Sequence, residues 1–372
     1  MEKSKRIFLK DLEEKDNFND HELNNLYEDI VDGLDKYDYY HDRELLFKVK
    51  DIFIENKMFF ETSHITKEIC ISYYKEGNIS KAIRYLENAA YILQNISGEY
   101  DINIQETLVN YMISIGVGYY EILSYESSIN TFKKCSKLID DKISDNVLWR
   151  YYHEYTISSI YTKDYDNAKK LADKALEYAH DNVKKGFTYN DLGRYYWKVK
   201  KPLDSRRAYD KGLELFKTEN HVYGLAMTYN NLAMLYYTTK KIEQAAEWIK
   251  KCFEIFDRNN PKECIIYFDT YIRIILKKRD FGEAVDKLLE FIRLSDNYSF
   301  EKRFILDAVE LVVDRISKFK DEEYGIKLKN ILIHLIKQTD NDDINDNYYS
   351  EKLYGYLGRL KYLFYKKSKR RD

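Results

Sequence analysis

Two asparagines in a duplicated motif are the residues of this 372-residue chain that most clearly suggest binding chemistry. The motif TYNDL (188–192) returns as TYNNL (228–232), so Asn190 and Asn230 lie 40 residues apart. An asparagine side chain carries hydrogen-bond donors and an acceptor, and it can therefore bond to a peptide group in both senses. Two such amides on successive helices would hold an extended peptide backbone without reading its sequence.

Charged and aromatic side chains share the helical face of these asparagines. Residues four and seven positions after an asparagine lie on its side of a helix, and here they include an arginine and two aromatics. These flanking groups would give the site its selectivity. The predicted peptide-binding residues are His153, Asn190, Arg194, Trp197, Asn230, Asn231, Tyr237, Asp269 and Arg273.

A structural interpretation of the same residues stays open at this point. Each asparagine can instead bond to a neighbouring helix or face solvent. Trp197 and Tyr237 can equally be packing residues, because aromatic side chains at helical spacing commonly fill a core.

Other kinds of site find little support in the sequence. The seven histidines form no HExxH motif and no pair at four-residue spacing, so no metal site is expected. The chain has no P-loop, GxGxxG or GxSxG motif. We therefore expect no catalytic residues, no enzyme activity and no cofactor. The four cysteines show no CxxC spacing and are interpreted as reduced core thiols.

A small residue recurs about every forty positions, each time within a pair of helical patterns. The intervals between successive positions are 46, 40, 37, 40, 39 and 41 residues. Self-similarity at this period predicts a helical solenoid, in which each unit buries its apolar face against its neighbours. The six good units and one degenerate unit are marked by Ala82, Ser128, Ala168, Ser205, Ala245, Ala284 and Gly325.

Composition agrees with a helical protein of three parts. Two prolines and thirteen glycines are few breakers for a chain of this length, and 61 basic residues nearly balance 63 acidic ones. Residues 1–62 read as a helical hairpin, with Asp20 as the expected N-cap of the first helix. Residues 63–335 form the repeats, and residues 336–372 hold an acidic turn, a capping helix and a basic tail. With no apolar segment of membrane-spanning length, we expect a cytoplasmic protein.

The unit ITKEICISYYKEGNISKAIRYLENAAYI (65–92) matches the tetratricopeptide pattern of small, aromatic and Gly-Asn positions. With its helix-A asparagines, the chain resembles the Rap, NprR, PlcR and PrgX group of bacterial regulators. The resemblance covers about residues 63–335. It implies an all-α, right-handed superhelical solenoid of tetratricopeptide-like hairpins that binds a short quorum-sensing peptide on its concave face, where Asn190 and Asn230 would hold the peptide backbone.

Two departures limit what this resemblance carries over. Residues 1–62 match no helix-turn-helix, so direct DNA binding is not expected. They also lack the glutamine that phosphatase-type members use, because the four glutamines (Gln94, Gln105, Gln244 and Gln338) lie elsewhere.

Three functions therefore stay open. The preferred hypothesis is a peptide-binding regulator that acts on a regulatory protein partner, possible as a homodimer. The alternatives are a constitutive scaffold for protein–protein assembly and a Rap-like response-regulator phosphatase.

Overall fold

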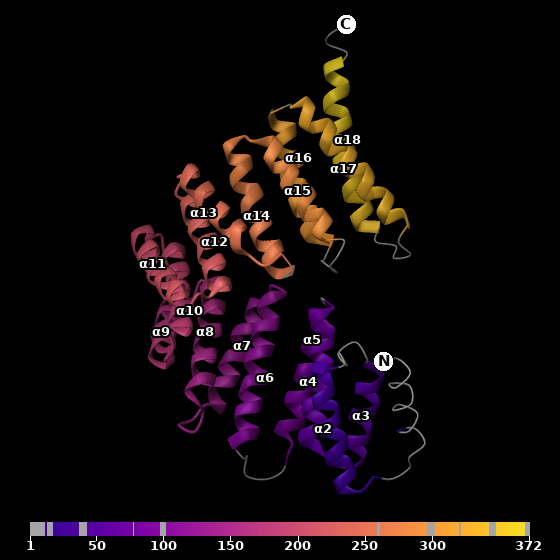
Figure 1. The fold of residues 1–372 in the computed structure, drawn as a ribbon, viewed down its shortest axis with the longest axis vertical. Helices are drawn as coiled ribbons and strands as arrows, with labels where there is room; N and C mark the ends of the chain where they lie inside the picture. Colours follow the sequence, from indigo (N-terminus) through magenta and orange to yellow (C-terminus); the bar gives the residue numbers. More distant parts are fainter. Residues whose placement is uncertain are drawn as a thin grey trace. The chain divides into compact units, whose positions relative to one another are not determined.

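The structure is a computed structural model, and it describes Leu12 and residues 18–36, 43–76, 78–96, 102–258, 261–295, 302–319, 321–341 and 347–368. The chain divides into two compact units, Met1–Ala179 and His180–Asp372 (Figure 1). The described part of the first unit contains α2 (Asp20–Lys36), α3 (Arg43–Glu55), α4 (Phe59–Lys75), α5 (Ile79–Gln94), α6 (Ile102–Glu121), α7 (Tyr125–Cys135), the short 3-10 turn η2 (Ser136–Leu138), α8 (Asp145–Tyr161) and α9 (Tyr165–Tyr178).

The second unit repeats the same helical-hairpin plan. Short turns join antiparallel helices, which we call helix A and helix B of each pair, and each helix A also contacts the helix A of the next pair. The helices are α10 (Asn182–Lys198), α11 (Pro202–Thr218), α12 (Val222–Thr238), α13 (Ile242–Ile255), α14 (Pro261–Lys278), α15 (Phe281–Ser295), α16 (Lys302–Phe319), α17 (Glu322–Asn341) and α18 (Asn347–Ser368).

Glycines on helix A make room for aromatic rings on helix B. A Cβ atom added to Gly193 would lie 2.4 Å from the ring of Tyr209, and one added to Gly116 would lie 2.7 Å from the ring of Phe132. Both rings are fully buried. In each pair the ring follows the glycine by sixteen residues, so the two helices approach closely only because one side chain is absent.

A hydroxyl group ties the same two helices together. Ser128 and Ser205, which mark the small-residue register, each donate a 2.7 Å hydrogen bond to the carbonyl oxygen of the glycine twelve residues earlier, Gly116 and Gly193. Both serines are fully buried. The serine therefore has two roles. It is small enough for the close contact between helices A and B, and its buried hydroxyl forms a hydrogen bond to helix A.

These features confirm the predicted all-α solenoid of tetratricopeptide-like hairpins. The described residues contain helices and turns and no strand. All four cysteines are buried and free, and burial raises the pKa of the Cys70 and Cys264 thiols to about 11. Both prolines lie at the first residue of a helix, where the missing N–H has no partner to lose.

Some details differ from the expectation. The N-cap of α2 is Asn19, not Asp20: Asn19 Oδ1 accepts from the backbone N–H of Glu22, and Glu22 accepts from that of Asn19, which is a capping box. The predicted boundaries at 62/63 and 335/336 fall inside α4 and α17, and they stay predictions. Residues 342–346 of the acidic turn and 369–372 of the basic tail lie outside the described residues.

Helix A ends in the same way in most pairs. In the α10–α11 turn, the backbone N–H of Lys201 bonds to the carbonyl of Tyr196 and that of Lys200 to the carbonyl of Trp197, which is a Schellman motif. The left-handed residue of this motif is usually glycine. Here it is Lys200 (φ 62°), and the equivalent residues are Lys163 (φ 64°), Lys240 (φ 63°) and Arg279 (φ 65°).

The residue after the left-handed position is the N-cap of helix B. Asp280 fills this role well, since its Oδ1 accepts the backbone N–H of Glu283 at 3.0 Å. In α11 and α13, however, the N-caps are Lys201 and Lys241, and a lysine side chain has no acceptor to offer. Each left-handed lysine and each lysine N-cap costs about 1 kcal/mol relative to the preferred residue.

The glycine–ring contact gives a first prediction. Replacing Gly193 with alanine (Gly193→Ala) forces Tyr209 to move within a filled core, and we expect the free energy of unfolding to fall by about 1–3 kcal/mol. Urea denaturation measures the change.

Gly355 in α18 is the matched control. An added Cβ meets no atom within 4 Å there, so Gly355→Ala should raise the free energy of unfolding by up to about 1 kcal/mol. Equal effects of the two substitutions would contradict the close approach at Gly193.

Candidate functional site

Asn190 lies buried between three helices of the second unit. Its Nδ2 donates to the carbonyl oxygen of Gly186 at 3.3 Å and to Thr228 Oγ1 on α12 at 2.8 Å, and its Oδ1 accepts from Asn231 Nδ2 at 3.1 Å. From α11, Gly212 leaves space beside the amide, since an added Cβ would lie 3.1 Å from Nδ2. The amide is fully buried, and its donors and acceptor are used within the protein.

Asn230 occupies the same place in the next repeat but has none of these partners. The residue is 6% exposed, and its buried Oδ1 accepts no hydrogen bond from any residue that the structure describes. A buried polar atom without a partner costs free energy, and such atoms are few in native proteins. The two asparagines of the duplicated motif therefore differ in their hydrogen bonding.

The spacing of the repeats explains this difference. The duplicated motif places Thr228 and Asn231 of the second copy opposite Asn190 of the first. The next step of the register is 39 residues, from Ala245 to Ala284, so the equivalent positions opposite Asn230 hold Tyr267 and Thr270. Neither of these residues donates to the Asn230 oxygen. The hydrogen bonds between the motifs thus join α10 to α12 and, in the described part of the chain, do not continue to α14, because the motif has only two copies.

This geometry corrects the prediction for Asn190. We expected Asn190 and Asn230 to present matching amides to a peptide, but Asn190 bonds to α12 instead, as the structural interpretation of the sequence allowed. Sequence periodicity could place Asn190 on helix A. It could not show that the partners 38 and 41 residues later would reach it.

The side chains around Asn231 form a stripe across the A helices α10, α12 and α14. Met227, Asn231 and Met234 of α12 are half-buried and lie four and three residues apart, on one face. We define the helix-A stripe as these three residues, Arg194 of α10 (equivalent to Met234), Ile266 and Arg273 of α14 (equivalent to Met227 and Met234), and the buried Asn230 of α12. Arg194 is 15% exposed and lies 3.7 Å from Asp191.

Trp197 and Tyr237, predicted to recognise ligand side chains, also contact neighbouring helices. Trp197 donates its indole N–H to Thr238 Oγ1 at 2.9 Å and packs against the buried cluster of Tyr209, Leu232 and Leu235. Tyr237 packs, half-buried, on the core of the second unit. Both rings therefore help to join successive pairs, and their exposed parts border the stripe.

Asp269 and Arg273 form an ion pair on α14. Arg273 Nε donates to Asp269 Oδ2 at 2.6 Å, and the side chains of Arg273 and Asp269 are 39% and 40% exposed respectively. The hydrogen bond to Asp269 raises the pKa of the Arg273 guanidinium, and Tyr237 and Asp307 add to this shift. The structure thus brings Asp269, Arg273 and Tyr237 together.

His153, the remaining predicted residue, belongs to the first unit, whereas the other eight belong to the second. Its half-buried ring stacks on Trp149, with ring centroids 5.0 Å apart and planes 7° apart. His153 occupies the same repeat position as Asn190 and Asn230. Each of the three lies fifteen residues before the small residue of its repeat, which is Ala168, Ser205 or Ala245 respectively.

The first unit also holds a polar cluster that the sequence analysis missed. His64 on α4 lies between Tyr27 of α2, whose hydroxyl is 2.5 Å from Nδ1, and the buried Glu68, whose Oε1 is 3.4 Å from Nε2. Burial opposes the charge on Glu68, but hydrogen bonds from His64 and Lys67 hold its pKa below the usual value. The four-residue spacing of His64 and Glu68 was the available signal.

Tyr27 is the third member of this cluster. Its pKa is raised to about 12, mainly by burial and further by Glu61 and Glu68. The phenol is therefore protonated at neutral pH, and it joins α2 to α4 as a hydrogen-bonding group.

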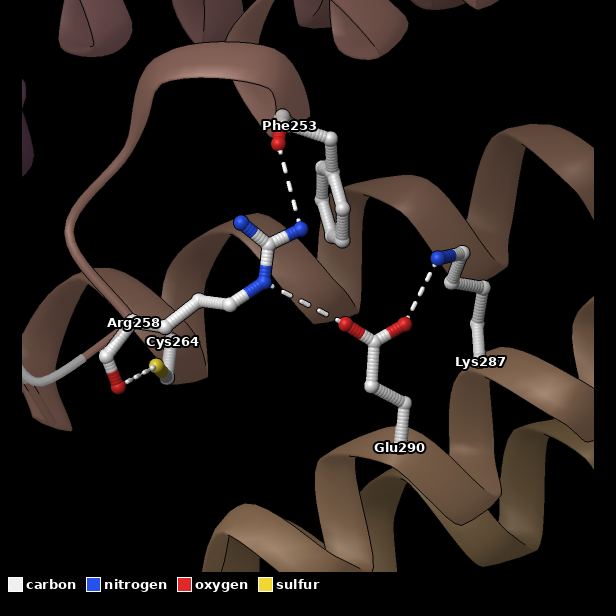
Figure 2. Close-up of polar contacts among 5 residues, drawn as sticks. All are labelled: Phe253, Arg258, Cys264, Lys287 and Glu290. Atoms are coloured by element: carbon white, nitrogen blue, oxygen red, sulfur yellow. Dashed lines mark hydrogen bonds and ion pairs between the residues drawn. The ribbon is translucent and has the colours of Figure 1, made fainter.

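A second polar cluster links the connection between α13 and α14 to α15 (Figure 2). Arg258 donates to the carbonyl oxygen of Phe253 at 3.2 Å and lies 3.4 Å from Glu290 on α15, which also accepts from Lys287 at 2.6 Å. The thiol of Cys264 donates to the carbonyl oxygen of Arg258. Because the charged groups are paired with one another, this cluster stabilises the fold and offers no open site.

The described residues hold neither a metal site nor a membrane-spanning helix. No group of three or more His, Cys, Asp or Glu side chains among them could hold a metal ion. None of the described helices has both the length and the apolar run that crossing a bilayer would require.

The duplicated motif and its hairpins are similar to a known repeat pattern. Residues 188–258 match the family model of the tetratricopeptide repeat. This stretch contains both copies of the motif and most of the two hairpins that carry them. A comparison with curated proteins gave no match.

Solved structures of low sequence identity share the fold. A Rap protein complexed with Competence and Sporulation Factor is 12% identical, covers 92% of this chain and 99% of its own, and has a TM-score of 0.55. A tetratricopeptide repeat protein from Parabacteroides merdae is 16% identical, with 77% and 98% covered and a TM-score of 0.52.

A signal transduction ATPase from Pyrococcus horikoshii, with a tetratricopeptide repeat sensor, is 18% identical and has a TM-score of 0.50. The match covers 94% of this chain and 47% of that protein, so this chain spans about half of its length. These likenesses confirm the tetratricopeptide-like fold. The closer relation to the Rap group stays a prediction.

The contrast between the two asparagines gives a second prediction. Asn190→Ala removes three hydrogen bonds, two of them to the buried Gly186 and Thr228, so we expect the free energy of unfolding to fall by about 1–3 kcal/mol. Asn230→Ala removes an unpaired oxygen, and stability should stay within about 1 kcal/mol of the original. Thermal and urea denaturation compare the two variants, and an equal loss in both would contradict the assignment.

Proposed function

We propose that this protein binds an extended peptide or protein segment along the helix-A stripe of its second unit. The observation that carries the proposal is the unpartnered amide oxygen of the buried Asn230, the residue before the half-buried Asn231 on α12. No hydrogen bond from the described residues holds this oxygen in place, so rotation of the amide plane toward the stripe breaks none at that atom. A peptide N–H group would supply the bond that Asn230 lacks within the protein.

The composition of the stripe suits an extended segment. Met227, Met234 and Ile266 supply apolar contact, and methionine adapts its shape to different side chains. Arg194 and Arg273 place cations at either side of the central helix, each beside an aspartate. Main-chain bonding to Asn230 would fix the segment, and the flanking groups would select its side chains.

The fold comparisons support the same class of function. The Rap structure of similar fold was solved in complex with Competence and Sporulation Factor, and the matched repeat spans both Asn230 and Asn231. On this basis the chain acts as a regulatory protein in the cytoplasm, where binding changes the packing of α12 on α14 and a protein partner senses that change. A constitutive scaffold would use the same stripe without the change in packing.

A peptide-retention experiment tests this function. The probe is a mixed library of N-acetylated heptapeptides passed over the immobilised full chain, with retained species identified by mass spectrometry and their affinities measured by calorimetry. Asn230→Ala should weaken binding of the retained peptides at least tenfold, since losing one or two hydrogen bonds to a ligand costs about 1.4 kcal/mol or more.

The control is Asn24→Ala in α2, which removes an exposed asparagine from another tandem pair, Asn24–Asn25. It should leave the affinities unchanged. If no heptapeptide is retained, or if Asn230→Ala binds as tightly as the original chain, the proposal is wrong.

A further inference from the structure

One end of the hairpins in the second unit carries a row of cations. We define the basic edge as the positively charged residues of three successive A–B turns: Lys198, Lys200, Lys201, Lys240, Lys241, Lys277, Lys278 and Arg279. Residues 198–201 and 238–241 contain no acidic residue, and Asp280 is the sole acid of the third turn. The opposite turns carry Asp181, Glu219 and Asp257 together with Arg258, so the excess of cations is confined to the basic edge on a chain whose net charge is only −2.

The cations of this edge are mostly exposed. Lys278 forms an ion pair with Glu243 at 2.8 Å, and Arg279 lies over the ring of Phe319. Lys200, Lys240 and Lys277 are exposed and form no ion pair within the described part of the chain. Neighbouring hairpins pack within about one Debye length of each other, so the charges of successive turns act together.

Helix electrostatics does not explain these lysines. A cation in the last turn of helix A is favourable, but the same turn begins helix B, where a cation is unfavourable. Lys201 and Lys241 stand at that N-cap without a capping bond, and Lys200 and Lys240 stand in a left-handed conformation that suits glycine or asparagine. The same two violations recur in adjacent repeats, which is the pattern expected of a functional surface.

We infer that the basic edge is a docking surface for an acidic segment of a partner protein. The surface is separate from the helix-A stripe, and the inference does not depend on peptide binding there. Lysine outnumbers arginine seven to one on the edge, whereas phosphate and base recognition favours the planar guanidinium. Lys198 of the edge lies over the ring of Trp197, and the indole N–H of Trp197 donates to Thr238, which holds this ring between α10 and α12. These features favour carboxylates over a nucleic acid.

The test combines four substitutions that should strengthen the fold while removing the charges. Lys200→Asn and Lys240→Asn place a residue that tolerates the left-handed conformation, and Lys201→Ser and Lys241→Ser provide an N-cap acceptor. The probe is poly-L-glutamate of about fifty residues, with the full chain at 20 and 200 mM salt. The thermal midpoint should rise, and affinity for poly-L-glutamate at 20 mM salt should fall at least tenfold.

A four-lysine control separates the edge from net charge. Lys57→Asn and Lys163→Asn relieve the same left-handed strain in the first unit, and Lys133→Gln and Lys134→Gln remove two exposed charges from α7. This control should bind poly-L-glutamate within twofold of the original chain.

Three binding results would overturn the inference. They are equal loss in the control, unchanged binding in the edge variant, and tighter binding of a 20-base-pair DNA duplex or of phosphatidylserine vesicles than of poly-L-glutamate. Because the edge variant is expected to be the more stable protein, its failure to fold would also contradict the inference.

Discussion

In two of the pairs, helix A and helix B meet where helix A has a glycine and helix B has an aromatic ring that fills the space. Gly193 with Tyr209 and Gly116 with Phe132 show the contact directly, and a serine hydroxyl bonds to the carbonyl of the same glycine. The other elements follow from this approach. It sets the spacing of the hairpin, the length of the turn and the side of helix A that is left for the next pair.

Much of the fold could be predicted because the small-residue register is a local pattern. Ala82, Ala168, Ala245 and Ala284 are all nearly or fully buried, as a helix contact requires. Even the sixth pair forms, although Ile272 stands where a small residue is usual, and Ile272 is itself fully buried. The N-cap of α2 was misplaced by one residue, because Asn19 and Asp20 are both good caps and only the hydrogen bonds of Glu22 decide between them.

The candidate site was harder to predict, because it depends on contacts between helices. Asn190 and Asn230 have the same local sequence, but one is saturated by Thr228 and Asn231 and the other has no such neighbours among the described residues. Nothing within the motif distinguishes them. The difference lies in residues about forty positions later, and it requires the packing of α10 on α12 and of α12 on α14 to be known. The cluster of Tyr27, His64 and Glu68 was missed for the same reason.

Asn190 is hydrogen-bonded to the next helix A, whereas the Asn230 oxygen is not bonded to any described residue, and this difference affects how the second unit deforms. Between α10 and α12 the hydrogen bonds of Asn190 are satisfied in only one alignment, so sliding or twisting these helices breaks buried polar bonds. Between α12 and α14 the described residues form no such bond to the Asn230 oxygen, and apolar contacts tolerate small shifts at lower cost. Elastic deformation of the second unit will therefore concentrate at the α12–α14 boundary, and α10 to α13 will move as one stiff block.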